Sequence, residues 1–386
     1  MDDRQAPEGL EPDAAALRRL LDELFAIEEI ALQRSDLFDQ TPPALPDGFE
    51  FERVEGMMLG LAIGDALGRP SEGRIPAKRR AAHGEIQDYV AGRRAKGGLG
   101  LPSDDTQLAY WTLEQLIADR RLVPHRVAAH LCEGTVFGMG QTVSAFRRNF
   151  KKAKLPWTQC GPASAGNGAL MRIAPIVIPH LREPSSALWV DTALASMLTH
   201  NDSASNAACV AFVAMLWELL GRPVGEAPDS RWWLERYVEL ARELETGTAY
   251  RPRGGKYQDY SGPLWRFVEQ RVAHALRHNI PTVDACDAWY SGAYLLETMP
   301  SVILILCRHG HEPEQAIVRA VNDTKDNDTI GAIVGAAVGA LHGRGRLPAR
   351  WIDGLSGRTR EADDGRTFEL LDQARGVFSP SVAGLV

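Results

Sequence analysis

The stretch that decides the fold is Asn327-Asp328-Thr329-Ile330-Gly331-Ala332-Ile333-Val334-Gly335-Ala336-Ala337-Val338-Gly339-Ala340-Leu341-His342-Gly343. Glycine recurs at every fourth position, and no residue after Asp328 in this stretch is acidic. In a helix interior each glycine costs about 1 kcal/mol relative to alanine. Close approach of the backbone to another buried helix is the simplest compensation. We therefore expect a helix over 329–342 at the centre of a helical bundle.

Across most of the rest of the chain, the apolar residues recur with the periodicity of a helix, and the period-2 alternation typical of strands is almost absent. The main apolar run that could be extended, Ile173–Ile178, contains a proline. The clearest helical patterns cover 53–67, 105–119, 203–221, 231–245, 263–278, 312–321 and 329–342. Short connectors rich in glycine, proline, asparagine and aspartate separate them. These patterns predict a compact, all-α, multi-helix fold.

Composition narrows the class of protein. The 386 residues are 45% hydrophobic and 24% charged, which is typical of a folded soluble chain. A net charge of −7 argues against nucleic-acid binding by bulk charge. The five scattered cysteines form no C-x-x-C pair, so we expect buried, reduced thiols. Without a signal peptide or a membrane-length apolar run, the sequence predicts a cytoplasmic protein with no membrane partner.

The acidity is concentrated at the N-terminus. Residues 1–50 hold 13 acidic residues against four arginines, a net of −9, so the remainder carries +2. Within this segment 13–33 has an amphipathic helical pattern, and 41–48 is a proline-rich linker. We divide the chain into an acidic N-terminal helical arm with its linker, 1–50, and a main domain, 51–386. Whether the arm packs on its own domain or on a partner stays open.

Two acidic clusters precede helical patterns, at Ser103-Asp104-Asp105-Thr106 and at Asn322–Thr329. Each residue type is common at helix N-caps, which is the simplest explanation of either cluster taken alone. The second cluster strains that explanation, because Asp326, Asp328 and Thr329 crowd the start of a helix expected to be buried. Two carboxylates about 4 Å apart repel by roughly 4 kcal/mol at an effective dielectric of about 20. A bound cation would relieve this repulsion.

The ligands on offer are carboxylate and hydroxyl oxygens, which favour Mg²⁺ or Mn²⁺ over zinc. Together the two clusters supply enough oxygens for two ions in one site. A third feature, Gly166–Arg172, places two glycines around Asn167, where backbone can approach a ligand closely and Arg172 could meet a phosphate. A fourth, Gly60–Glu72, reads as a helix that ends just before Glu72 and carries Asp65 on an apolar face. Asp65 either supports a neighbouring loop, which is the role we expect, or forms part of the site.

In this order and over 53–343, these segments together resemble the ADP-ribosylglycohydrolase family. The matching segments are Gly64-Asp65-Ala66-Leu67-Gly68, Ser103-Asp104-Asp105-Thr106-Gln107, Gly166-Asn167-Gly168-Ala169-Leu170-Met171-Arg172, Thr199-His200 and Asp326-Asn327-Asp328-Thr329-Ile330. The resemblance implies an all-α fold with a central binuclear metal site, holding two Mg²⁺ ions or, alternatively, Mn²⁺. One departure is that many members read Gly-Gly-Asp-Thr-Asp-Thr where this chain reads Thr324-Lys325-Asp326-Asn327-Asp328-Thr329.

The resemblance also implies roles for single residues. The implied metal ligands are Ser103, Asp104, Asp105, Asp326, Asp328 and Thr329. The implied catalytic carboxylates are Glu72, Asp104, Asp105 and Asp326, with the choice of general base left open. The implied substrate-binding residues are Gly166, Asn167, Gly168, Arg172, His200 and Tyr294.

The function so implied is metal-dependent removal of ADP-ribose from modified protein side chains, arginine before serine or other linkages, by cleavage at ribose C1. The partner is then an ADP-ribosylated protein. Some bacterial family members similar to this chain also carry an N-terminal extension and act as immunity proteins. The alternative is therefore that residues 1–50 bind and occlude an ADP-ribosylating toxin, with or without hydrolysis.

Overall fold

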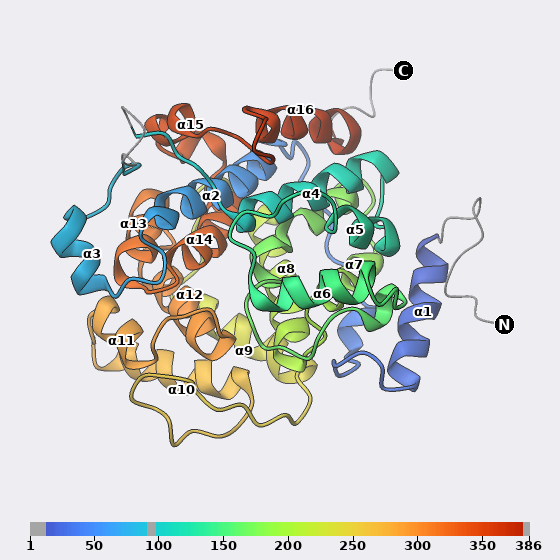
Figure 1. The fold of residues 1–386 in the computed structure, drawn as a ribbon, viewed down its shortest axis with the longest axis horizontal. Helices are drawn as coiled ribbons and strands as arrows, with labels where there is room; N and C mark the ends of the chain where they lie inside the picture. The colour runs from blue at the N-terminus through green and yellow to red at the C-terminus, as the bar shows by residue number, and fades with distance from the viewer. Residues whose placement is uncertain (1–12, 91–97, 381–386) are drawn as a thin grey trace.

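The computed structural model describes residues 13–90 and 98–380, which form sixteen α-helices joined by short loops and 3₁₀ turns (Figure 1). Within these ranges there is no β-strand, so the predicted all-α class is confirmed. The helices are α1 Ala14–Ala26, α2 Glu52–Gly68, α3 Pro76–His83, α4 Asp104–Asp119, α5 Pro124–His130, α6 Gln141–Lys151, α7 Ala187–Met197, α8 Ser203–Gly221, α9 Trp232–Leu244, α10 Leu264–Arg277, α11 Thr282–Ala288, α12 Leu295–His309, α13 Pro313–Asp323, α14 Asn327–His342, α15 Ala349–Gly354 and α16 Arg366–Phe378.

The glycine-striped helix α14 is buried along its whole length, and α2 is its main packing partner. The two run antiparallel, and a matching glycine stripe on α2 faces the stripe on α14. A Cβ on Gly335 would lie 2.0 Å from the carbonyl oxygen of Gly60, and a Cβ on Gly60 would lie 2.2 Å from that of Gly335. Gly64 and Gly331 approach each other just as closely. The expected close approach to a second buried helix is therefore confirmed.

The interface between the glycine stripes of α2 and α14, here called the seam, positions the site. Because the two helices run in opposite directions, the seam brings the end of α2 beside the start of α14. The last turn of α2 lies beside the first turn of α14, where a Cβ on Gly68 would be 2.4 Å from the Asp328 backbone. Helices α4, α8, α12 and α13 also pack against α14. The start of α4, which carries the first acidic cluster, meets the end of α2 here. Both acidic clusters thus lie at one end of the central helix pair.

The described part of the N-terminal segment, 13–50, packs on the rest of the chain. The buried leucines of α1 face α7, and α1 lies at the edge of the molecule in Figure 1. The indole of Trp189 donates to the carbonyl of Gln40 at 2.8 Å, and that of Trp217 donates to the carbonyl of Pro43 at 2.9 Å. The side-chain amide of Asn201 donates to the carbonyl of Glu29 at 2.7 Å. The helix and the proline-rich stretch are therefore held by several separate polar contacts.

The seven helical patterns match α2, α4, α8, α9, α10, α13 and α14 within about two residues at each end. The run Ile173–Ile178, the one candidate extended segment, forms part of a 3₁₀ helix over Ala174–His180, consistent with its proline. Helix α8 has the length and apolar composition of a membrane span, but 89% of its apolar window is buried inside the structure. A core helix of a globular domain meets the same criterion.

Candidate active site

Asp65, in the last turn of α2, organises the start of α4. Its buried carboxylate accepts hydrogen bonds from the backbone amides of Ser103, at 2.9 Å, and Thr106, at 3.0 Å, and from the Thr106 hydroxyl at 2.5 Å. Ser103 is the N-cap of α4 and accepts from the amide of Asp105. These contacts satisfy donors that a helix start leaves without partners. The loop-supporting role expected for Asp65 matches this arrangement.

Asp65 also belongs to the acid cluster itself. Carboxylate oxygens of Asp65, Asp105 and Asp328 lie within 4.8 Å of one another. Carboxylate oxygens of Glu72, Asp326 and Asp328 form a second group with the same spacing. Asp328, in the first turn of α14, is common to both groups. The structure therefore brings carboxylates from three separate parts of the chain into two adjoining oxygen clusters.

The electrostatics of the cluster favour bound cations. Burial, reinforced by neighbouring carboxylates, raises the pKa of Asp105 and Asp328 well above the usual range. Burial raises the pKa of Asp104 to about 8 and that of Asp326 to about 6. One oxygen of Asp105 is buried and has no hydrogen-bond partner among the residues that the structure describes. Hard oxygen donors at this spacing, with an unpartnered buried oxygen among them, fit a pair of divalent cations.

The acid cluster lies at the floor of a cavity of about 340 Å³. Glu72 is exposed at this cavity, just past the end of α2 and the following 3₁₀ turn. The cavity is lined by Glu72, Asp104, Asp105, Gly138, Gly140, Gln141, Thr142, Val143, Ser164, Gly166, Asn167, Gly168, Met171, His200, Arg253, Ala293, Asp326, Asp328 and Thr329. Ten of the thirteen residues predicted for the site are therefore among its lining residues.

The glycine loop is tied directly to the acids. The side-chain amide of Asn167 donates to Asp326 at 2.6 Å and to the Thr298 hydroxyl at 3.1 Å. Gly166 pairs through its backbone with Tyr294, at the start of α12. A Cβ on Gly168 would lie 2.8 Å from the imidazole of His200, so only glycine allows this approach. The predicted loop thus forms a wall of the same cavity.

The side chains of His200 and Arg172 both contact the hydroxyl of Thr199, but only His200 lines the cavity. Burial, with Arg172 nearby, lowers the pKa of His200 to about 3, so its imidazole is neutral. The imidazole Nδ1 lies 3.0 Å from the Thr199 hydroxyl oxygen. Arg172 donates to that same oxygen and to the carbonyl of Ala195, both at 2.8 Å. Arg172 is fully buried behind the glycine loop and is not among the lining residues, so the structure does not bring its guanidinium to the cavity.

Two further predicted residues lie beside the lining rather than in it. Ser103 donates to Asp105 at 3.0 Å and thereby orients one carboxylate of the cluster. The ring of Tyr294 lies under the guanidinium of Arg253, whose central carbon is 4.0 Å from the ring centroid. Ser103 therefore acts here as a cap and hydrogen-bond donor, and Tyr294 lies at the rim.

Arg79 could not be identified from the sequence, because it lies between Lys78 and Arg80 in a basic run of the kind usually found on the surface. Arg79 is fully buried, and its guanidinium donates to the carbonyl of Thr324 at 2.6 Å and to the Ser71 hydroxyl at 2.8 Å. It thereby joins the loop that carries Glu72 to the loop that precedes Asp326. No local pattern separates this arginine from its neighbours. Arg253 and the hydroxyl pair Thr142–Ser164, 3.0 Å apart on the cavity wall, were missed for the same reason.

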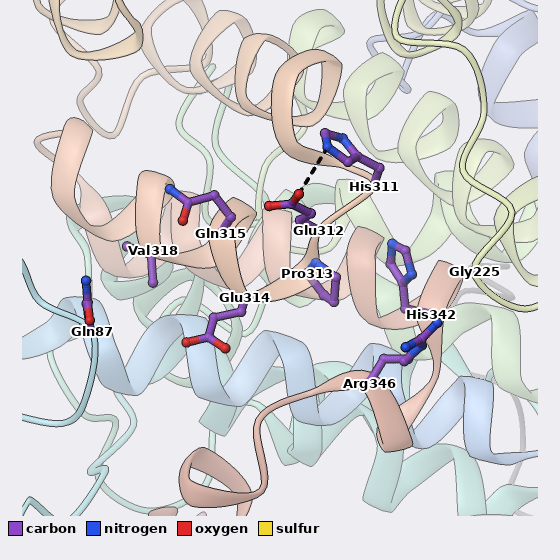
Figure 2. Close-up of a pocket in the computed structure, with 10 residues that line it drawn as sticks. All are labelled: Gln87, Gly225, His311, Glu312, Pro313, Glu314, Gln315, Val318, His342 and Arg346. Atoms are coloured by element: carbon purple, nitrogen blue, oxygen red, sulfur yellow. Dashed lines mark ion pairs between the residues drawn. The ribbon is translucent and has the colours of Figure 1, made fainter.

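A second hollow, of about 500 Å³, lies at the opposite end of α14 (Figure 2). It is lined from the start of α13, the end of α14 and the turn after it, and includes His311, Glu312, Glu314, His342 and Arg346. His311 and Glu312 form an exposed pair at 3.5 Å. The hollow is larger than the first, but its lining residues, as far as the chain is described, include no buried group of carboxylates.

Fold and site together define an all-α enzyme whose carboxylate-floored cavity is built at one end of a central helix pair. Residues 46–378 match the family model described as ADP-ribosylglycohydrolase. The chain therefore belongs to the ADP-ribosylglycohydrolase family, a family of hydrolases, as its motifs predict.

Its relatives carry related names. The chain is 24% identical over 318 residues to the ADP-ribosylarginine hydrolase Tri1 of Pseudomonas putida, covering 78% of this chain and 74% of that one. It is 26% identical over 323 residues to the ADP-ribosyl-[dinitrogen reductase] glycohydrolase of Rhodospirillum rubrum, covering 79% and 90%. It is 23% identical over 343 residues to ADP-ribosylhydrolase ARH3 of Xenopus tropicalis, covering 83% and 95%.

A solved structure titled ADP-ribosylglycohydrolase-related protein complex has the same fold. The TM-score is 0.62 at 23% identity, and the match covers 86% of this chain and 98% of that one. At this identity the likeness concerns the fold alone.

Proposed function

We propose that the protein is a Mg²⁺-dependent hydrolase that releases ADP-ribose from modified arginine side chains of proteins. The observation that carries this proposal is the pair of adjoining carboxylate groups that share Asp328 on the cavity floor. The arginine linkage is supported by the names of two relatives, the Tri1 proteins of Pseudomonas putida and Serratia proteamaculans. Serine-linked ADP-ribose is the alternative within the same activity.

The residues that would hold the cations are the two carboxylate groups, Asp65 with Asp105 and Asp328, and Glu72 with Asp326 and Asp328. Ser103, Asp104 and Thr329 are further proposed ligands around them. Bound cations would polarise ribose hydroxyls and offset the negative charge of the cluster. Asn167 would keep Asp326 oriented through its 2.6 Å hydrogen bond, which links the glycine loop to the acids.

Hydrolysis adds water across the bond between ribose C1 and the arginine nitrogen. The transition state resembles an oxocarbenium ion, and the surrounding carboxylates stabilise its positive charge. Glu72 lies exposed at the cavity, where water reaches it, and is the proposed general base. Arg79 keeps the Glu72 loop against the Asp326 loop and so holds this carboxylate over the reacting centre.

The test is an assay of free ADP-ribose released from arginine-linked and serine-linked ADP-ribosyl proteins. The protein is first treated with EDTA and dialysed, and then supplied with Mg²⁺, Mn²⁺, Ca²⁺ or no cation. We expect release from the arginine-linked substrate that requires Mg²⁺ and is partly restored by Mn²⁺. Release from the serine-linked substrate alone would contradict the linkage, and full activity without any cation would contradict the metal assignment.

For a toxin-blocking role of residues 1–50, the described part of the segment offers less free apolar surface than its amphipathic sequence pattern suggests. The apolar stripe of α1 is already buried against α7 through Leu17, Leu21 and Leu24. Within the described part of this segment, the surface left for a toxin is the outer, acidic face of 13–50, where Ile27 is 64% exposed. Capture of an ADP-ribosylating toxin by the wild-type protein, lost in Ile27→Asp and kept in Asp328→Ala, would support this second role.

A further inference from the structure

A basic loop between α9 and α10 reaches the cavity. Its sequence, Tyr250-Arg251-Pro252-Arg253-Gly254-Gly255-Lys256, holds three cations in six residues after the tyrosine. The loop is closed by backbone hydrogen bonds between Tyr250 and Gly262, of 2.8 and 3.2 Å. The amide of Lys256 donates to the carbonyl of Ala288 at 2.7 Å. The loop is therefore anchored at both ends and in its middle.

Glycine at two positions allows this anchoring. Gly255 has φ +77°, and a Cβ there would lie 2.3 Å from the carbonyl oxygen of Ala288. A Cβ on Gly254 would lie 2.7 Å from the ring of Tyr290. A side chain at Gly255 would collide with the backbone of Ala288, so this packing requires glycine there. That packing sets where Arg253 stands.

Arg253 stands at the cavity beside the glycine loop. Its guanidinium lies over the ring of Tyr294, and its positive charge acts on the buried carboxylate of Glu297 in the first turn of α12. Tyr294 pairs through its backbone with Gly166, so Arg253 and the glycine loop face the same part of the cavity. Arg253 is supported on one face and exposed, and among the described residues its guanidinium has no hydrogen-bond or ion-pair partner, so its donors can meet a ligand.

The charges of the residues that line the cavity indicate which part of a substrate Arg253 binds. Five carboxylates line the cavity, and among the lining residues that the structure describes Arg253 is the one lysine or arginine. A substrate bearing a diphosphate brings two negative charges into this cavity, and Arg253 is the lining side chain that can pair with them. A guanidinium binds phosphate oxygens in a bidentate manner. On the basis of the proposed function, we infer that Arg253 binds the diphosphate of ADP-ribose and sets the specificity of the enzyme for it over unphosphorylated nucleosides.

The test is calorimetric titration of the metal-loaded protein with ADP-ribose and, separately, with adenosine, which lacks phosphate. The proteins are wild type, Arg253→Ala, Arg253→Lys and the matched control Arg251→Ala, an exposed arginine on the same loop that does not line the cavity. We expect Arg253→Ala to weaken ADP-ribose binding roughly 10- to 100-fold. Lysine should recover part of this loss, and adenosine binding should be the same in all four proteins.

Two results would overturn the inference. Equal ADP-ribose affinity in wild type and Arg253→Ala would remove Arg253 from the binding site. Equal losses for ADP-ribose and adenosine would place it against the adenine instead of the diphosphate. A wild-type protein that binds no ADP-ribose would refute the proposed function itself, which is a separate outcome. Thermal melting of each variant checks that the exposed substitutions leave the fold intact.

Discussion

The two ends of α14 carry similar residue types but differ in how those residues are solvated and paired. At the N-terminal end the carboxylates are buried and converge within 4.8 Å in two groups. At the C-terminal end, Glu312 pairs with His311 and Glu314 with Arg350, and all four side chains are exposed. The buried His342 there donates to the carbonyl of Gly310 at 2.8 Å.

This difference shows what distinguishes a reactive centre from a surface depression. The hollow at the C-terminal end is the larger one, about 500 Å³ against about 340 Å³. Its charges are nevertheless compensated by partners in the chain or by water. At the N-terminal end the buried carboxylates lie close together, and among the described residues the nearby cations, Lys325 and Arg79, are too few to balance them, so bound cations would stabilise the cluster. Uncompensated burial, rather than cavity size, therefore identifies the site.

The largest expected difference between the two ends of α14 follows from removing one carboxylate at each. Asp328→Ala should lower release of ADP-ribose roughly 100- to 1,000-fold, because Asp328 belongs to both carboxylate groups. Glu312→Ala, at the other end, should leave the rate unchanged. Both rates come from the same release assay at saturating Mg²⁺. Comparable losses in the two variants would show that the ends are not functionally distinct.

The second prediction concerns the seam that fixes both ends. Gly335→Ala should lower the free energy of unfolding by about 3 kcal/mol, because the new methyl group would lie 2.0 Å from the Gly60 carbonyl oxygen. Gly221→Ala, at the end of α8 with no neighbour within 4 Å, is the matched control and should be neutral or slightly stabilising. Urea titration followed by circular dichroism measures both. Equal stability of the two variants would contradict the close contact.

A third prediction compares one arginine near each end. Arg79 is buried among carbonyls of two site loops, and Arg350 is exposed beside Glu314. Arg79→Ala should lower the free energy of unfolding by about 2–3 kcal/mol, since buried carbonyls lose a charged donor. Arg350→Ala should change it by less than about 1 kcal/mol. Thermal or urea unfolding decides between these values, and a larger effect at Arg350 would reverse the interpretation.

The smallest expected effect is a pH dependence confined to the N-terminal end. Burial raises the pKa of Asp104 to about 8, whereas in an unfolded chain it is about 3.9. Without cations, the stability that this group contributes is present below about pH 4 and is lost as pH rises through about 8. Bound Mg²⁺ offsets the loss, so it should raise the melting temperature roughly 2–4 °C more at pH 8 than at pH 6.

The control for this prediction is Asp328→Asn, which removes a carboxylate from both groups. Its melting temperature should respond less to Mg²⁺ and should show little difference between the two pH values. Carboxylates that lose their protons as pH rises should bind Mg²⁺ more strongly at pH 8 than at pH 6. A Mg²⁺ effect on the melting temperature that is larger at pH 6 in the wild-type protein would contradict this. It would exclude the acid cluster as the cation site.

Much of the site was predictable because its residues sit in short, dense motifs. The four-residue glycine repeat predicts a buried, closely packed helix, and α14 is that helix. The acids before it predict charge crowding, and the structure places Asp326 and Asp328 in one oxygen group. Arg172 illustrates the limit, since it lies four residues after the second glycine of the glycine loop yet points behind the loop to Thr199. Spacing along a chain does not say on which side of a turn a side chain emerges.

By itself, the sequence determined the all-α class, the central position of α14 and the set of acids, because periodicity, glycine spacing and charge density are local properties. Only the tertiary structure decided that Asp65 joins the acid cluster and that Arg253 lies over the ring of Tyr294. It also decided that Arg79 is buried and joins two loops of the site by hydrogen bonds. Each of these roles depends on contacts between segments far apart along the chain. Such contacts arise when separate helices bury their apolar faces together, and no short pattern records them.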